Sequence, residues 1–99
     1  MKHFIINITY TVPLSKIDQI LSEHRKFLQE GYNNELLLLS GPRNPRTGGV
    51  VLARSESIDE IKSFFERDPY KINKCAVYEF IEFDPVKHQP MLENWILGK

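Results

Sequence analysis

The sequence predicts an α+β fold, a ferredoxin-like β-α-β-β-α-β sandwich with two helices on one face of a four-stranded antiparallel sheet. Three observations predict it. Four short segments have the apolar patterns of strands, two segments have the apolar spacing of amphipathic helices, and they alternate in the order that this fold requires. The 99 residues leave room for a single domain over residues 1–99, with a core over about residues 3–83 and a C-terminal extension over residues 84–99.

The first predicted strand covers residues 3–10, where apolar side chains alternate with more polar ones. One face is strongly apolar and the other is mixed. The residues of the apolar face are Phe4, Ile6, Ile8 and Tyr10. Such alternation indicates a strand with one face against the core.

Residues 15–30 are predicted to form the first helix. Ser15 stands three residues before Asp18, a spacing that resembles a capping box, and Gly31 is a natural stop signal. One side of this helix is apolar, and His24 lies within it. Because an unpaired buried polar group costs about 1–3 kcal/mol, we expect His24 to meet a polar partner inside the fold or at the mouth of a pocket. The apolar residues on the same side are Ile17, Ile20, Leu21, Phe27 and Leu28.

Residues 35–40 and 50–54 are predicted to be the second and third strands. The run ELLLLS is short and ends at a Gly-Pro pair, which favours a buried strand over a helix. The intervening loop, GPRNPRTGG, contains Arg43 and Arg46. We therefore expect the two strands to form a hairpin with a long loop.

Residues 57–67 are predicted to form the second helix. Ser57 and Glu60 have the spacing of a capping box, and Pro69 marks the end, because proline disfavours helical geometry in the residue before it. Residues 76–83, AVYEFIEF, are predicted to be the fourth strand.

The extension ends in MLENWILGK, which is predicted to form a short helix. We expect this helix to bury Met91 and Trp95, with Leu92 as a further candidate.

The first and fourth strands carry apolar residues on both faces. Two helices can cover only one face of the sheet, so the other face would be left as an exposed apolar patch. Ile5, Val77 and Ile81 belong to that second face. A partner sheet packed against it would bury these side chains, so the sequence predicts a two-fold homodimer with the sheets face to face.

The composition limits the kinds of partner and the cellular compartment that we expect for this protein. Thirteen basic and thirteen acidic residues give a net charge of +0, so no basic excess favours a nucleic-acid partner. The single cysteine, Cys75, excludes an internal disulfide and fits a reducing compartment. The first residues do not resemble a signal peptide, and no apolar run approaches the length of a membrane span. We expect a cytoplasmic protein without a membrane partner.

Three segments carry residues suited to chemistry: His24, the Ser40-Gly41-Pro42 turn and the Asp68-Pro69-Tyr70 turn. Asp68 could accept a hydrogen bond from one imidazole nitrogen of His24, which would fix the tautomer and leave the other nitrogen for proton transfer. Spacing alone does not show that the two residues meet. A structural reading, in which Asp68 only forms a turn and His24 is a core residue, stays open.

Further polar residues are candidates for binding a substrate. Ser40 could hydrogen-bond the imidazole or a substrate oxygen, and Tyr70 could line a pocket. Arg43 and Arg46 could bind a carboxylate or phenolate through their forked donors, or be solvated loop residues. Arg25 and Lys26 are predicted to lie on the solvated face of the first helix. The histidines lack the spacing of metal ligands, so neither a metal nor a cofactor is predicted.

This combination resembles the YCII-related (YciI-like) domain family over about residues 3–83. The resemblance implies the dimeric α+β barrel built from ferredoxin-like subunits, and a His–Asp pair in a cleft. His24 and Asp68 match that pair, with Ser40 and Gly41 beside it. The residues that carry the resemblance are His24 with Phe27 and Leu28, the run from Leu37 to Pro42, Gly48 with Gly49, and the run from Asp68 to Tyr70.

Two functions follow from these residues. The first is a lyase-like or isomerase-like enzyme in which His24 and Asp68 act as a general acid/base pair on a small, anionic or aromatic substrate. Its pocket would lie between the first helix and the sheet, with aromatic walls from Tyr70, Tyr78 or Phe80. The alternative is a non-catalytic module that binds a metabolite or a protein and uses the same pair as a structural brace.

Overall fold

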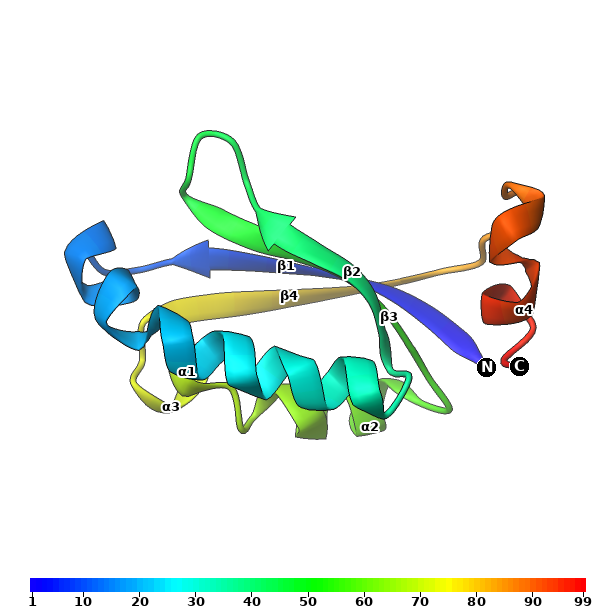
Figure 1. Cartoon of the computed structure of the whole chain (residues 1–99), viewed down its shortest axis with the longest axis horizontal. Coiled ribbons are helices and arrows are strands. Elements are labelled where there is room, and N and C mark those ends of the chain that lie inside the picture. The colour runs from blue at the N-terminus through cyan, green and yellow to red at the C-terminus, as the bar shows by residue number, and fades with distance from the viewer.

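The four strands form one antiparallel sheet in the spatial order β2-β3-β1-β4, with the longest helix lying across one face (Figure 1). The computed structural model describes residues 1–99. The predicted α+β order and the sheet with helices on one face are confirmed. The elements are β1 (Lys2–Tyr10), α1 (Leu14–Asn33), β2 (Leu37–Pro42), β3 (Gly48–Ser55), α2 (Ile58–Phe65), α3 (Pro69–Ile72), β4 (Ala76–Phe83), the 3-10 turn η1 (Pro90–Leu92) and α4 (Glu93–Ile96).

The core lies between the inner face of the sheet and the helices. On this face, Phe4 and Ile6 of β1 pair with Ala53 and Val51 of β3, and all four side chains are buried. Burying one large apolar side chain contributes about 1.5–3 kcal/mol, so the alternation in β1 positions the sheet against the helices. The helices contribute Ile17, Ile20, Phe27, Leu28, Ile61, Phe64 and Phe65.

The first helix differs from its prediction at both ends. It begins directly after Pro13 without a side-chain cap, so the capping box predicted at Ser15 is wrong. It also continues past Gly31, which is buried. A Cβ atom at Gly31 would lie 2.7 Å from Leu37 and 2.8 Å from Phe64. This glycine therefore allows α1 to pack closely on β2 and α2, and it does not end the helix.

The second helix begins as predicted, because the Ser57 Oγ accepts a hydrogen bond from the Glu60 N–H at 3.1 Å. The turn after it forms a further short helix, α3, whose N-cap is Asp68. The second strand is displaced from its predicted position toward the loop and includes Pro42. This is possible because β2 is an edge strand, where proline can be accommodated. Its pairing with β3 also shifts register between Leu37 and Leu39, as at a β-bulge.

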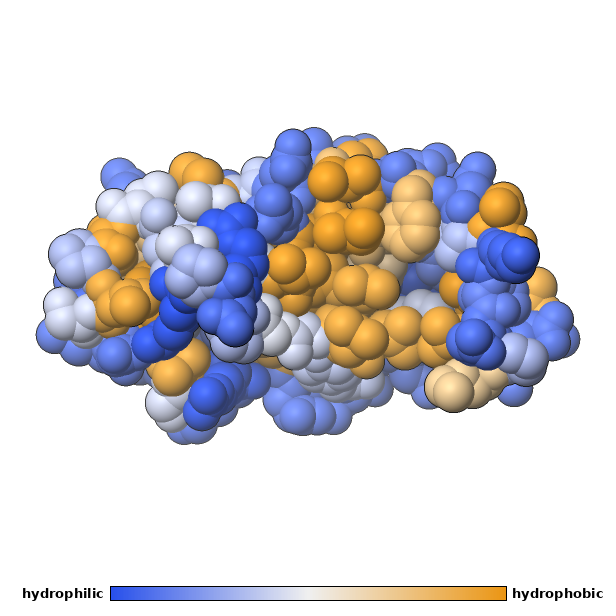
Figure 2. Space-filling model, turned by 90° about the horizontal axis from the view of Figure 1, so that it is seen from above, coloured by the Kyte–Doolittle hydropathy of each residue, from blue (hydrophilic) through white to orange (hydrophobic).

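The outer face of the sheet carries a row of apolar side chains. Ile5 pairs with Leu52 on one side and with Ile81 on the other, and Leu39 pairs with Leu52. Leu39 is 53% exposed and Ile81 is 42% exposed. Figure 2 shows a continuous apolar patch in orange across the middle of this face, with blue hydrophilic residues on either side of it. The uncovered face has the character that the sequence predicts, and the homodimer inferred from it stays a prediction.

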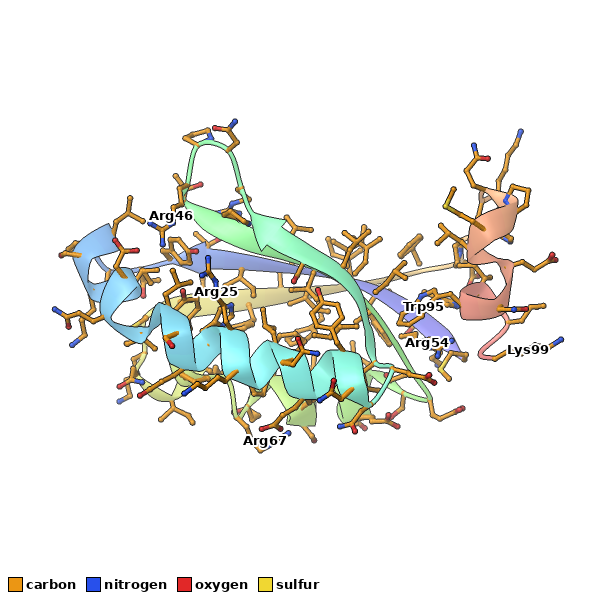
Figure 3. All side chains as sticks on the ribbon, in the orientation of Figure 1. Arg25, Arg46, Arg54, Arg67, Trp95 and Lys99 are labelled. Atoms are coloured by element: carbon orange, nitrogen blue, oxygen red, sulfur yellow. The ribbon has the colours of Figure 1, made fainter.

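The C-terminal extension is attached to the far end of the sheet through Arg54 and His3 (Figure 3). The buried Arg54 guanidinium lies 3.9 Å from the centroid of the Trp95 ring and donates a hydrogen bond to the Trp95 carbonyl at 2.8 Å. The His3 Nε2 donates to the Ile96 carbonyl at 3.1 Å. Met91 is 86% exposed, so its predicted burial is wrong; the extension meets the sheet through Trp95 and its neighbours.

No helix of the structure is both long and apolar enough to cross a membrane.

Replacing Trp95 by alanine should release the extension from the sheet, because it removes the ring stacked on Arg54. We expect hydrogen exchange of the amides in residues 90–99 to accelerate several-fold, as measured by mass spectrometry, since such a contact contributes about 0.5–2 kcal/mol. The matched control is Met91→Ala, which removes an exposed side chain of the same segment and should leave the exchange unchanged. Unchanged exchange in Trp95→Ala would contradict this account of the anchor.

Candidate active site

His24 and Asp68 are in direct contact, although 44 residues separate them in the sequence. The His24 Nδ1 donates a hydrogen bond to the Asp68 Oδ1 at 2.7 Å. Asp68 reaches this position because it caps α3, where the same oxygen accepts the Tyr70 N–H at 3.0 Å. The His24 Nε2 has no protein partner and is not fully enclosed, so it is the imidazole nitrogen available to a ligand.

The Asp68 carboxylate is fully buried and receives three hydrogen bonds. In addition to the two at Oδ1, the Tyr78 hydroxyl donates to Oδ2 at 2.6 Å. The donors come from α1, α3 and β4, so the carboxylate joins three elements. Asp68 does not line the cavity. It lies behind the imidazole and orients it.

A cavity of about 440 Å³ lies between α1, the inner face of the sheet and the β2–β3 loop. Of the three aromatic walls considered from the sequence, Tyr70 lines this cavity, while Tyr78 and Phe80 do not. Most of the wall is apolar, and the predicted Ser40, Gly41 and Arg46 lie on it. The full lining is Ile8, Tyr10, Leu21, His24, Arg25, Leu28, Ser40, Gly41, Pro42, Arg46, Gly49, Val50, Val51 and Tyr70.

Tyr70 fixes the imidazole from a second direction. Its ring stacks on that of His24 with the centroids 3.9 Å apart and the planes 13° from parallel. Tyr70 is 1% exposed, and its hydroxyl has no hydrogen-bond partner within the protein. Burial raises the pKa of this hydroxyl well above its usual range. Tyr70 therefore keeps its proton and holds an unused donor beside the cavity.

The polar residues of the β2–β3 hairpin have different positions. The Ser40 Oγ lies 2.5 Å from the Tyr32 hydroxyl, with which it shares a hydrogen bond. Arg46 lines the cavity and donates to the Asp18 carboxylate at 2.7 Å, and this hydrogen bond raises the pKa of Arg46. Arg43 is outside the cavity. Its guanidinium donates to the Asn7 side chain and to the Thr47 carbonyl, so the structure does not bring it to the site.

Arg25, predicted to lie on the solvated face of the first helix, is exposed and also lines the cavity. The signal was present in the spacing, because Leu21, Arg25 and Leu28 follow one another at i, i+4 and i+7 and share one flank of the helix. All three line the cavity.

The three histidines lie in separate places. His3 contacts the extension, His24 lines the cavity, and His88 belongs to the extension itself. No group of three or more His, Cys, Asp or Glu side chains is arranged to hold a metal ion.

Comparison with known proteins identifies the family. The model of the YCII-related domain matches residues 1–84. The chain belongs to the YCII-related domain family. The extension that Arg54 and His3 hold lies mostly beyond the matched region. Comparison with curated proteins gives no match.

A solved structure shares the fold of this YCII-related chain. It is 5-chloro-2-hydroxyhydroquinone dehydrochlorinase from Burkholderia phenoliruptrix AC1100, in complex with 2,5-dihydroxybenzoquinone. The TM-score is 0.70 at 21% sequence identity, over 90% of this chain and 97% of the other. The likeness confirms the predicted ferredoxin-like α+β fold of the chain.

The tyrosines of the site should titrate abnormally. Burial raises the pKa of both Tyr70 and Tyr78, and at Tyr78 the negative charge of Asp68 adds to this effect. In an absorbance titration at 295 nm, we expect two of the four tyrosines to stay protonated until the protein unfolds. Tyr70→Phe and Tyr78→Phe should each remove one tyrosine from this late group.

The raised pKa values of Tyr70 and Tyr78 also predict how the free energy of unfolding changes with pH. Above a pH of about 10, these tyrosines lose protons in the unfolded chain and retain them in the folded one, so the free energy of unfolding should fall as pH rises. Full ionisation of all four tyrosines in the folded protein would contradict the assignment.

Proposed function

We propose that this YCII-related protein is a small-molecule enzyme in which His24 acts as the general acid/base and Asp68 orients it. The observation that supports this most directly is that the two ring nitrogens of His24 face different partners. Its Nδ1 is bound to a buried carboxylate, and its Nε2 is left for a molecule in the cavity. The substrate is small and anionic or aromatic, because the cavity combines apolar walls with cationic side chains at its edge.

The reaction class is proton transfer at a carbon next to a carbonyl. The His24 Nε2 takes the proton, the electron pair of the broken C–H bond becomes the C=C π bond of an enolate, and the carbonyl π pair moves to its oxygen. An elimination follows if the carbonyl re-forms, the enolate pair shifts to a new C=C bond, and a leaving group on the next carbon departs with its bonding electrons. An isomerisation follows if the imidazolium returns the proton to another carbon. A positioned acid/base group of this kind contributes about 10²–10⁴-fold in rate.

Two hydroxyl-bearing residues that line the cavity with His24 are suited to stabilise the oxygen that gains negative charge. Tyr70 holds a protonated hydroxyl without a partner, and Ser40 lines the same cavity. Hydrogen-bond donors fixed before the reaction stabilise such an oxyanion without reorganising during it. The dehydrochlorinase with the same fold has a name that describes an elimination, which agrees with this reaction class.

The test is turnover by His24→Gln. We expect loss of at least about 10²-fold in rate, because the amide cannot carry the proton. The assays are chloride release from 5-chloro-2-hydroxyhydroquinone and exchange of carbon-bound protons for deuterium in a panel of hydroxyquinones and keto acids, followed by NMR. His88→Gln is the matched control, since His88 does not line the cavity, and it should keep full activity. Equal turnover by His24→Gln and the wild type would show that His24 is not the acid/base.

The alternative function is a non-catalytic binding module with a structural His–Asp brace. The three donors to the buried Asp68 favour a structural contribution from this residue. His24→Leu should lower the free energy of unfolding under either function, because it takes one donor from the buried Asp68 carboxylate. The two functions differ instead in turnover, because a non-catalytic module turns over none of the compounds in the panel.

We also propose that the protein is a homodimer in which the outer sheet faces pack together. The row formed by Leu39, Leu52, Ile5 and Ile81 crosses all four strands, with Leu39 and Ile81 exposed and Ile5 and Leu52 partly exposed. Sheets packed face to face bury such a row, and a two-fold axis makes one apolar patch serve both subunits.

Replacing Ile81 by aspartate should convert the dimer to a monomer at micromolar concentration, because the charge would be buried between the sheets. Sedimentation equilibrium measures the change. The control is Ile72→Asp on α3, a residue that is 65% exposed on the helical side, and it should leave the mass unchanged. A wild-type protein that sediments as a monomer at this concentration would contradict the proposal.

A further inference from the structure

The cavity carries positive charge and no carboxylate on its lining. Its two arginines, Arg25 and Arg46, come from α1 and from the β2–β3 loop. Asp68 lies behind the imidazole and does not line the cavity. Figure 3 shows the side chain of Arg25 rising from α1 toward the sheet, on the side where Arg46 extends from the loop.

The two arginines differ in whether a nearby carboxylate neutralises their positive charge. Arg46 is held by Asp18 at 2.7 Å, so its charge is partly neutralised and its guanidinium is fixed. Arg25 makes no ion pair within 4.0 Å and no side-chain hydrogen bond. It follows His24 directly in α1, and both residues line the same cavity. Arg25 is exposed to solvent and also lines the cavity, so its guanidinium is free to meet a ligand there.

A second observation points to a ligand in the same space. The Tyr70 hydroxyl is buried and has no partner, although a buried hydroxyl normally has one. Tyr70 lines the cavity together with both arginines. A molecule with two separated oxygen groups would give a partner to this hydroxyl and to the free guanidinium.

We propose that Arg25, flanked by Arg46, is a carboxylate-binding subsite, so that the substrate is a small hydroxyaromatic or enolic acid. This inference rests on the proposed function and specifies its substrate. The carboxylate accepts hydrogen bonds from the fork of Arg25 and from the N–H groups of Arg46 that Asp18 leaves free. The ring lies on the apolar wall with its reacting carbon toward the His24 Nε2. The cavity volume of about 440 Å³ suits one ring with its substituents.

The test compares 2-hydroxybenzoate with 2-hydroxybenzamide, which share a ring and differ by one negative charge. Dissociation constants are measured by calorimetry, and NMR of the His24 imidazole shows that binding occurs in the cavity. We expect the wild type to bind the benzoate about tenfold more tightly, the effect of one charge-assisted hydrogen bond. Arg25→Gln should reduce this ratio to about one, and Arg25→Lys should keep part of it.

Two variants sharpen the comparison. Lys26→Gln removes the same charge from the adjacent residue, which does not line the cavity, and should leave the ratio at its wild-type value. Asp18→Asn removes the carboxylate that neutralises Arg46 and should raise the ratio, because the charge of Arg46 then acts on the ligand.

A ratio that is the same in Arg25→Gln as in the wild type would overturn the subsite. Absence of binding by both compounds would overturn it too. Binding is measured without turnover, so the result is independent of the acid/base role of His24. If His24→Gln retains activity while Arg25→Gln loses the charge preference, the subsite stands and the proposed role of His24 fails.

Discussion

The buried carboxylate of Asp68 is the constraint on which the rest of the structure depends. A carboxylate removed from water is costly unless hydrogen bonds replace those it loses, and here three donors do so. Because these donors are His24 of α1, the Tyr70 N–H of α3 and the Tyr78 hydroxyl of β4, satisfying the carboxylate also fixes the positions of three elements. The imidazole, held by this bond and by the stacked ring of Tyr70, is thereby aimed at the cavity.

Much of the fold follows from local patterns. Alternation in the strands, helical spacing and the capping box at Ser57 predict the order of the elements, because each depends on residues close together in the sequence. The errors arise where distant contacts decide. Gly31 has the signature of a helix stop, but close packing against Leu37 and Phe64 uses it inside the helix. Met91 is apolar, yet the extension is anchored elsewhere, and its side chain is left in solvent.

Some residues of the candidate site could likewise be predicted from the sequence, and others could not. His24 could be found from the sequence, because an imidazole within an apolar stripe needs a partner. The topology allows Asp68 as the partner of His24 and the family resemblance selects it, since no local pattern relates two residues 44 positions apart in the sequence. Arg43 and Arg46 are the same residue type in one loop, so the sequence does not distinguish them. The path of the loop places Arg46 at the cavity and Arg43 against Asn7 of β1. Arg25 has the charge of a solvated residue, and its place on the flank of the stripe was the only clue.

The edges of the sheet have a consequence for how the protein associates. An exposed edge strand can recruit further strands and lead to aggregation. The edge strand β2 is short, is interrupted by the register shift between Leu37 and Leu39, and ends at Pro42, which has no N–H to donate. On the opposite edge, β4 carries Glu79 and Glu82. Lateral growth of the sheet into fibrils is disfavoured on both sides, so the apolar character of the outer face does not make this a protein that polymerises through its strands.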